Sequence, residues 1–189
     1  MEPRMTYDTY LDKVHGAWFG KCLGGAAGAP VEGVKGTVRA SLRDLLDPSL
    51  PNDDLDLQLL WLEVLERKGP FLDSDDLSAA WLAQCWYPFG EYGYFLRNYM
   101  RGIRPPVSGW FNNRFFLDGM GCPIRSEIWA LTHPGRPREA ARYARLDAVL
   151  DHADNSLWAE IFLAALQSLA FDGGTPEELV LRASAFLEE

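Results

Sequence analysis

The stretch Leu50–Leu62 reads L-P-N-D-D-L-D-L-Q-L-L-W-L and joins a cluster of oxygen-bearing side chains to the start of an apolar stripe. Asn52, Asp53 and Asp54 form the cluster, at the beginning of a predicted helix. The apolar residues that follow recur at the spacing of one helical face, and they are Leu57, Leu60, Trp61, Val64 and Leu65. Gly69-Pro70 should end this helix. The stretch therefore predicts an amphipathic helix with an acidic N-terminal end.

The rest of the chain shows the same helical spacing, without the strict alternation that is typical of a half-buried strand. We expect further helices at about Tyr7–Gly20, after a cap at Asp73 or Ser74, and at Pro137–Asp151, Leu157–Phe171 and Pro176–Leu187. Thr175 and Glu178 have the spacing of a capping box around Pro176. Since no internal repeat or linker is visible, we expect residues 1–189 to form one compact, multi-helix, all-α domain.

The segment Tyr87–Pro123 is rich in aromatic residues, Gly, Pro and Asn and is long for a loop in a compact domain. We expect it either to be functional or to contain short helices. Its aromatic rings could stack on an adenine, and Asn112 or Asn113 could bond ribose hydroxyls. For the Trp and Phe side chains, packing in the core is the favoured alternative.

The net charge of −9 argues against a nucleic-acid groove, because phosphate contacts need clustered Lys and Arg. Cys22, Cys85 and Cys122 lie far apart and form no C-x-x-C pair, so we expect neither a zinc site nor a disulfide framework. The N-terminal residues lack the apolar core of a signal peptide, and no apolar run approaches the ~18 residues of a membrane span. We therefore expect a cytoplasmic protein without a membrane contact.

The side chains of Asn52, Asp53 and Asp54 suit a hard cation such as Mg²⁺, which takes oxygen ligands and keeps several waters. A structural alternative exists for the same residues. Asn52 can cap the helix, and acidic residues are favourable near a helix N-terminus. The residues alone leave both interpretations open.

Three segments in order resemble the ADP-ribosylglycohydrolase family, which includes the activating glycohydrolase of dinitrogenase reductase. The first is H-G-A-W-F-G-K-C-L-G-G-A-A-G-A-P-V-E-G at His15–Gly33, and the second is Leu50–Leu62. The third begins with G-M-G-C-P-I-R-S-E-I-W-A-L at Gly119 and ends with L-D-H-A-D-N-S-L-W at Leu150–Trp158. The resemblance covers nearly the whole chain.

This resemblance implies an all-α fold that cleaves the bond between ADP-ribose and an acceptor with the help of two Mg²⁺ ions. Asn52, Asp53 and Asp54 match the first metal motif, whereas Leu55 stands where relatives often have a Thr ligand. Relatives are usually longer and carry a second acidic motif, D-x-D-T-like, late in the chain. We therefore expect this chain to be incomplete at its C-terminus and to hold one Mg²⁺ ion or none.

The resemblance also assigns the other site residues. Glu32 and Asp53 are the implied catalytic residues, and a carboxylate such as Glu32 can stabilise an oxocarbenium-like state or handle a proton. Gly25 stands where several relatives have an Asp.

The implied substrate-binding residues are Gly119, Met120, Gly121, Cys122 and His152, which would lie along the diphosphate, adenosine or distal ribose. A helix after Pro123 would point its N-terminus at the phosphates. The alternatives are an ordinary loop, a structural His152, and a structural ion pair between Arg125 and Glu127.

The leading hypothesis is a Mg²⁺-dependent hydrolase acting on small-molecule or protein-linked ADP-ribose. One rival is a non-catalytic module that binds ADP-ribose or a nucleotide. The other is a structural or interaction protein with a degenerate site, in which self-association covers an exposed apolar patch.

Overall fold

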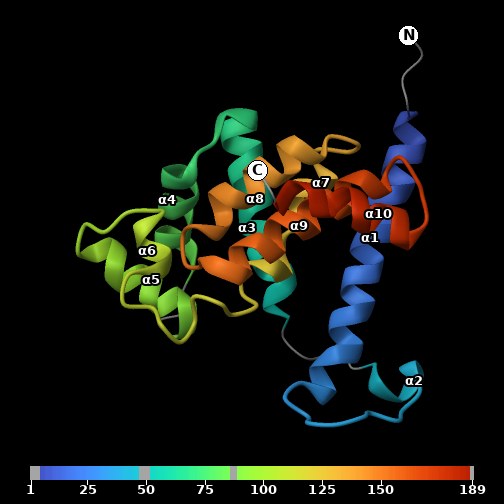
Figure 1. The fold of residues 1–189 in the computed structure, drawn as a ribbon, viewed down its shortest axis with the longest axis horizontal. Coiled ribbons are helices and arrows are strands. Elements are labelled where there is room, and N and C mark those ends of the chain that lie inside the picture. Colours follow the sequence, from blue (N-terminus) through green and yellow to red (C-terminus); the bar gives the residue numbers. More distant parts are fainter. Residues whose placement is uncertain (1–4, 47–51, 86–88, 188–189) are drawn as a thin grey trace. The chain divides into compact units, whose positions relative to one another are not determined.

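The computed structural model describes residues 5–46, 52–85 and 89–187, and these residues form helices, turns and loops without a β-strand. The expected all-α fold is therefore confirmed (Figure 1). The chain divides into two compact units, Met1–Leu57 and Gln58–Glu189. The expectation of a single domain over residues 1–189 stays a prediction. Leu50 and Pro51, which open the second motif, lie outside the described residues.

The first unit consists of α1 (Tyr7–Gly28), a short 3-10 helix η1 (Ala29–Val31), α2 (Leu42–Leu45) and the first turn of α3 (Asp53–Lys68). Thr6 caps α1 by accepting a hydrogen bond from the backbone N–H of Thr9 at 3.2 Å. The expected end at Gly20 is wrong, since α1 continues to Gly28. Each interior glycine costs a helix only ~1 kcal/mol, and Pro30 is the first residue that removes a backbone donor.

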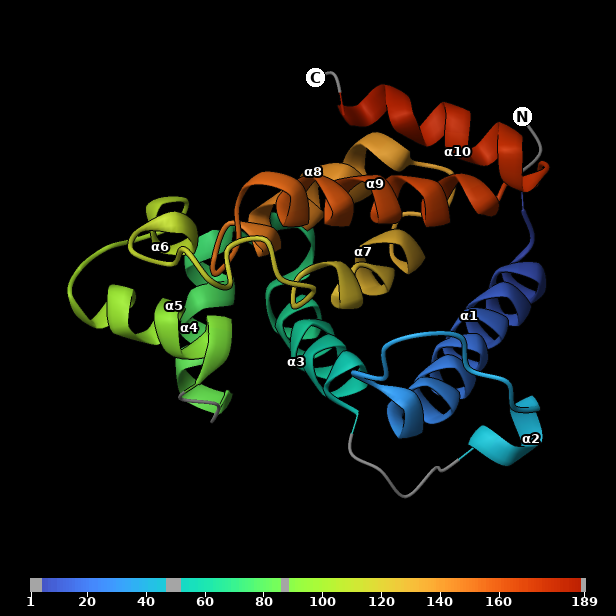
Figure 2. The same ribbon diagram turned by 60° about the horizontal axis from the view of Figure 1, so that its bottom comes forward.

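The second unit contains the rest of α3 and all later helices. These are η2 (Gly69–Phe71), α4 (Ser74–Gln84), α5 (Gly90–Met100), α6 (Val107–Trp110), η3 (Pro123–Arg125), α7 (Glu127–Leu131), α8 (Pro137–Ala148), α9 (Asp154–Ala170), α10 (Pro176–Ser184) and η4 (Ala185–Leu187). Helix α9 packs against α7, α8, α10, η3 and η4, and Figure 2 shows it beside α8 and α10. The expected capping box is present at Thr175, and of the two expected caps Asp73 is the N-cap of α4, where it forms a capping box with Asp76.

Aromatic side chains form the centre of the second unit. Trp61 packs edge-on against Trp81 with ring centroids 5.5 Å apart, and its ring lies 6.4 Å from that of Trp129. Trp81 also stacks on Phe95, and Trp129 stacks on Tyr143. All five side chains are at most 2% exposed. The core therefore joins α3, α4, α5, α7 and α8 through a continuous set of ring contacts.

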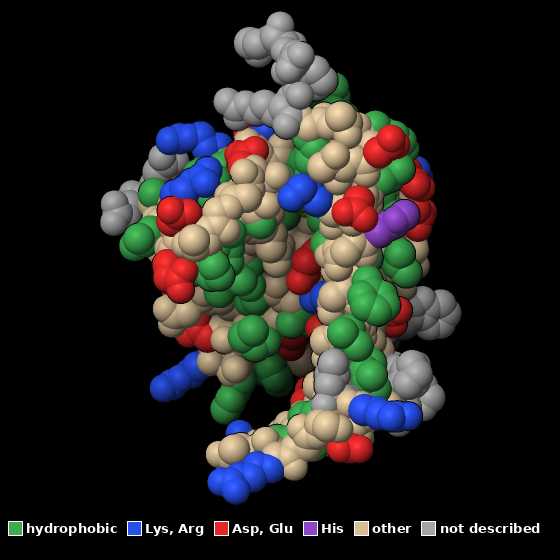
Figure 3. Space-filling model, turned by 90° about the vertical axis from the view of Figure 1, so that its right-hand side faces the viewer, with side chains coloured by type: hydrophobic (Ala, Val, Ile, Leu, Met, Phe, Trp, Pro, Cys, Tyr) green, Lys and Arg blue, Asp and Glu red, His purple; other side chains and the backbone are tan. Residues whose placement is uncertain are grey.

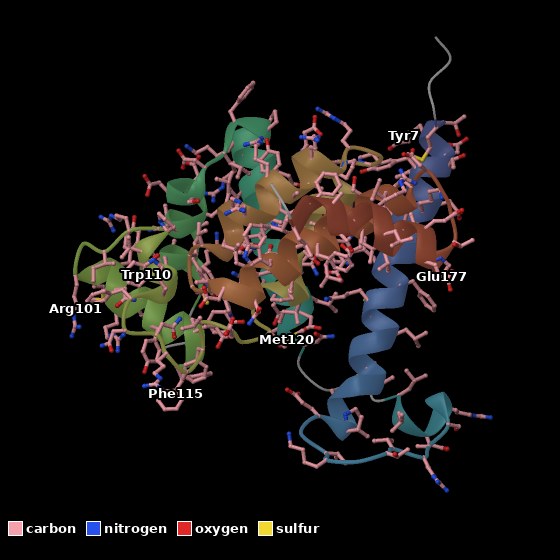
Figure 4. All side chains as sticks on the ribbon, in the orientation of Figure 1. Tyr7, Arg101, Trp110, Phe115, Met120 and Glu177 are labelled. Carbon is pink, nitrogen blue, oxygen red and sulfur yellow. The ribbon has the colours of Figure 1, made fainter. Side chains whose placement is uncertain are left out.

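The long aromatic segment contains the short helices α5 and α6, and its residues 86–88 lie outside the described part of the chain. Asn113 is fully buried, and its Nδ2 donates hydrogen bonds to the carbonyls of Gly109 and Asp151 at 2.8 and 2.9 Å. Its amide donors therefore hold the backbone and do not reach out to a ribose. In contrast, Trp110 and Phe115 lie at the surface (Figure 4).

On the face shown in Figure 3, acidic and basic side chains are interspersed with hydrophobic ones. Among the described residues, none of the helices combines the length and the apolar character needed to cross a bilayer.

Replacing Trp81 with Ala should lower the free energy of unfolding by ~3–5 kcal/mol, because the ring leaves a cavity among Trp61, Phe95 and Tyr92. Chemical denaturation followed by circular dichroism measures this loss. Phe71→Ala is the control, since Phe71 is 90% exposed and its loss should change stability by less than ~0.5 kcal/mol. Equal losses for the two variants would contradict the assigned core.

Candidate functional site

The first unit contains a cavity of about 330 Å³ between the end of α1 and the start of α3. Its lining combines small residues with oxygen-bearing side chains. The lining residues are Gly24, Gly25, Gly28, Ala29, Glu32, Asn52, Asp53 and Asp54. Four predicted site residues, Glu32 and Asn52 to Asp54, therefore share one cavity.

Two helix ends position these four side chains. The carbonyl of Asn52 accepts hydrogen bonds from the N–H groups of Leu55 and Asp56 at 3.2 and 3.4 Å, which starts α3. Asp53 and Asp54 consequently lie in its first turn, where the helix dipole favours negative charge. On the other side, the N–H of Glu32 donates to the carbonyl of Ala29 at 3.3 Å, which closes η1.

Gly25 makes room for Asn52. A Cβ atom at position 25 would lie 2.0 Å from Asn52 Nδ2 and 3.0 Å from its Cγ, far inside van der Waals contact. Any side chain at this position would therefore displace the Asn52 amide. Gly25 is thus matched to the Asn52 side chain at the start of α3.

Lys21 supplies a positive charge next to the cavity. Its Nζ lies 3.6 Å from Asp54 Oδ2, and the two side chains are 11% and 30% exposed. Lys21 precedes Gly25 by one turn of α1, so the same helix face carries the cation and the small residue. The ammonium group neutralises part of the negative charge that Asp53 and Asp54 concentrate there.

The residues in this cavity fit a hard cation that retains part of its water shell. The side chains of Glu32, Asn52, Asp53 and Asp54 carry carboxylate or amide oxygens, which are the ligand atoms that Mg²⁺ takes. Leu55 offers no ligand, and the described residues contain no group of three or more His, Cys, Asp or Glu arranged to hold a metal. Asn52, Asp53 and Asp54 would therefore hold an ion together with water or substrate oxygens.

The second unit brings Gly119, Gly121 and His152 together. A Cβ atom at Gly119 would lie 3.6 Å from His152 Nε2, and one at Gly121 would lie 2.8 Å from His152 Cε1 and 2.2 Å from Glu91 Oε1. Gly121 therefore separates an imidazole from a carboxylate with no space for a side chain. His152 is 1% exposed, and its Nε2 has no hydrogen-bond partner among the described residues.

The other two residues of the predicted loop point in opposite directions. Met120 is 66% exposed (Figure 4), whereas Cys122 is fully buried with its Sγ 3.1 Å from Ser156 Oγ. Burial raises the pKa of the Cys122 thiol well above its ordinary value, so this side chain stays neutral. Helical structure does start at Pro123, but it is short, because η3 spans three residues and the following α7 five.

The buried side chain of Arg125 fixes the loop that contains Gly121 by hydrogen bonds. Its Nε donates to Asp147 Oδ1 at 2.8 Å, its Nη2 to Asp151 Oδ1 at 2.7 Å and its Nη1 to the carbonyl of Gly121 at 2.9 Å. The expected pair between Arg125 and Glu127 is therefore wrong. Glu127 instead accepts a hydrogen bond from Gln58 at 2.9 Å.

The charged side chains around Arg125 lie in short contact with groups of opposite charge. Asp151 Oδ1 also lies 2.8 Å from His152 Nδ1. Burial alone would raise the pKa of Asp151, but Arg125 and His152 outweigh it and lower this pKa below its ordinary value. Asp147 accepts a further hydrogen bond from the indole N–H of Trp129 at 3.0 Å. Both carboxylates are thus fixed structural partners of Arg125.

The sequence analysis missed Glu160, a fully buried carboxyl group on α9. Burial and the nearby charge of Asp147 raise the pKa of Glu160 well above its ordinary value of 4.5. Neither of its oxygens meets a hydrogen-bond donor among the described residues. A proton on Glu160 would remove the buried negative charge and would allow Glu160 to donate a hydrogen bond to Asp147. The sequence signal for Glu160 is its position as a single acidic residue on the apolar face of α9. Leu157 and Ile161, on either side of it in the sequence, are both buried.

The model of the ADP-ribosylglycohydrolase family matches residues 6–189. Because the match covers almost the whole sequence, the chain belongs to this family. Neither the curated proteins nor the solved structures include a significant match.

Replacing Glu160 with Gln should flatten the dependence of stability on pH. The raised pKa means that the folded state keeps a proton that the unfolded state has lost. The free energy of unfolding of the parent chain therefore falls as pH rises from 4.5, by up to ~1.4 kcal/mol per pH unit. Urea denaturation between pH 4.5 and 8 measures this slope.

The control for this experiment is Glu66→Gln, which removes an exposed carboxylate. This variant should keep the slope of the parent chain, whereas Glu160→Gln should lose part of it. An unchanged slope in Glu160→Gln would show that Glu160 is ionised in the folded protein.

Proposed function

We propose that this protein is a Mg²⁺-dependent hydrolase that cleaves the glycosidic bond between ADP-ribose and an acceptor. One observation carries the proposal: the carboxylate of Glu32 lines the same cavity as the metal-type side chains of Asn52, Asp53 and Asp54. Membership of the family supports the reaction class. We further propose that the substrate is ADP-ribose linked to a small molecule or to a protein, and that the protein is cytoplasmic. Self-association stays a prediction.

Each side chain in the cavity would have its own role in the reaction. When bound, Mg²⁺ polarises substrate oxygens and lowers the pKa of water. Asn52, Asp53 and Asp54 would hold the ion, with Lys21 limiting the negative charge around Asp54. Glu32 would stabilise the positive charge that develops on the ribose ring or would handle a proton of the attacking water.

We also propose that Gly119, Gly121 and His152 form a subsite for the phosphates or the distal ribose. The buried, unpartnered Nε2 of His152 supports this proposal, because a ligand oxygen could satisfy it. Met120 lies at the exposed side of the loop, and Cys122 holds the loop through Ser156.

The second candidate function is a non-catalytic module that binds ADP-ribose. The position of Lys21 favours it, since an ammonium group 3.6 Å from Asp54 Oδ2 would repel a cation bound at that carboxylate. Binding without turnover would support this alternative over the hydrolase.

Glu32→Gln should reduce hydrolysis of ADP-ribosylated peptides by ~10²–10⁴-fold, because the neutral amide neither stabilises an oxocarbenium-like state nor accepts a proton. Release of ADP-ribose from arginine- and serine-linked peptides in the presence of Mg²⁺ measures the rate. Glu63→Gln, on the far part of α3, is the control and should keep the rate of the parent chain. Equal rates for the Glu32→Gln and parent proteins would remove Glu32 from the mechanism.

Gly25→Ala should weaken the binding of Mg²⁺ by at least ~10-fold, because the new Cβ would push the Asn52 amide out of its position. Isothermal titration of MgCl₂ measures the affinity. Gly20→Ala on the same helix is the matched control, since a Cβ there meets nothing within 4 Å. If both variants bind Mg²⁺ equally well, Asn52 is a helix cap and takes no part in binding the ion.

A further inference from the structure

A second cavity, of about 470 Å³, lies on the second unit between α8 and the segment formed by α9 and η4. Three arginines and three apolar or small residues line it. These residues are Arg138, Ala141, Arg142, Arg145, Ile161 and Phe186, and we refer to their cavity as the arginine groove. None of them belongs to the candidate site described above.

The helical repeat brings the three arginines to one side of α8. Positions 138, 142 and 145 are separated by four and three residues, which places them on one helical face. The opposite face is buried in the core, and its residues are Ala140, Tyr143, Ala144, Asp147 and Ala148. The arginine groove is therefore the solvent side of a helix whose other side is fixed by packing.

Aromatic rings hold two of the guanidinium groups. Arg142 Cζ lies 4.1 Å from the ring centroid of Tyr143, and Arg145 Cζ lies 4.8 Å from that of Trp158. A guanidinium that stacks on a ring keeps its N–H edges available for hydrogen bonds. The rings thus reduce the conformational freedom that each arginine would lose on binding a ligand.

Neither Arg142 nor Arg145 forms an ion pair with a carboxylate among the described residues. By contrast, their neighbour Arg136 pairs with Glu139 at 2.8 Å, and Arg125 is neutralised in the core. The whole chain has a net charge of −9. The groove nevertheless concentrates positive charge, because no carboxylate of the described residues pairs with Arg142 or Arg145. An anionic ligand would supply the counter-charge.

The apolar residues of the groove indicate which chemical group the ligand carries besides its anionic group. Ile161 is 2% exposed and lies with Ala141 and Phe186 along the lining. Arginine recognises phosphate through paired N–H donors, and an aromatic ring can stack on Phe186. The cavity volume falls in the range of small-molecule sites, ~300–1,000 Å³.

We propose that the arginine groove binds a small molecule that carries a diphosphate and an aromatic ring, such as a nucleoside diphosphate. The diphosphate pairs with Arg142 and Arg145, and the ring lies against Ile161 and Phe186. No residue of the groove lines the proposed catalytic cavity, so its ligand can act as an effector.

The test is isothermal titration of ADP and of inorganic pyrophosphate into the full chain without Mg²⁺. Arg142→Gln/Arg145→Gln should bind ADP at least ~100-fold more weakly than the parent chain, since each charge-assisted contact contributes about tenfold or more. Arg142→Lys/Arg145→Lys should be intermediate, because it keeps the charge and loses the paired donors. Circular dichroism checks that each variant is folded.

The matched control is Arg101→Gln/Arg114→Gln, which removes the same charge from two exposed arginines elsewhere on the unit. It should bind ADP within ~3-fold of the parent chain, because neither Arg101 nor Arg114 lines the groove and exposed charges are screened by salt. Asp53→Asn should also bind normally, which separates this site from the proposed catalytic cavity. Equal affinity of the two double Gln variants, or no binding by the parent chain at millimolar ADP, would overturn the proposal.

Pyrophosphate tests the ring contact separately. Weaker binding of pyrophosphate than of ADP, together with a loss of that difference in Phe186→Ala, would support the ring position. Equal affinities of the parent chain for the two probes would overturn it.

Discussion

The second unit depends on one buried charge, the guanidinium of Arg125. This group lies 4.7 Å from the ring centroid of Trp81 and donates hydrogen bonds to Asp147, Asp151 and the carbonyl of Gly121. Asp147 belongs to α8, Asp151 precedes α9, and Gly121 belongs to the loop beside His152. Removing one partner of a buried ion pair typically costs ~3–5 kcal/mol, because the other charge stays buried. A single residue thus couples the aromatic core, the α8–α9 pair and the candidate substrate loop.

In each unit, a glycine leaves the space that a neighbouring polar side chain occupies. Gly25 leaves space for Asn52 in the first unit, and Gly121 leaves space between Glu91 and His152 in the second. In each case a side chain would collide with a polar group that the proposed function uses. Gly25 and Gly121 therefore act by close packing against these polar side chains. Neither of these two glycines has a positive φ, so backbone freedom is not the reason for their presence.

Sequence patterns predicted the helices well, because helices depend on local rules, and four of the residues that they singled out line the first cavity. Apolar spacing located α3, and the Thr175 and Glu178 capping box started α10 correctly. Patterns failed where partners come from distant segments. Arg125 was matched with its neighbour Glu127, whereas its carboxylates lie more than twenty residues away in sequence at Asp147 and Asp151. Glu160 had no local signal beyond its position in an apolar stripe.

The central claim is that Glu32 and the Asn52–Asp54 side chains form one site for ADP-ribose and Mg²⁺. Isothermal titration of ADP-ribose into the chain, with and without Mg²⁺, tests it most directly. The Arg142→Gln/Arg145→Gln background removes the arginine groove as a second place for the ligand. The account predicts binding that strengthens when Mg²⁺ is present and is weakened by Asp53→Asn. Absence of binding in both conditions, or binding that ignores both Mg²⁺ and Asp53→Asn, would contradict the account.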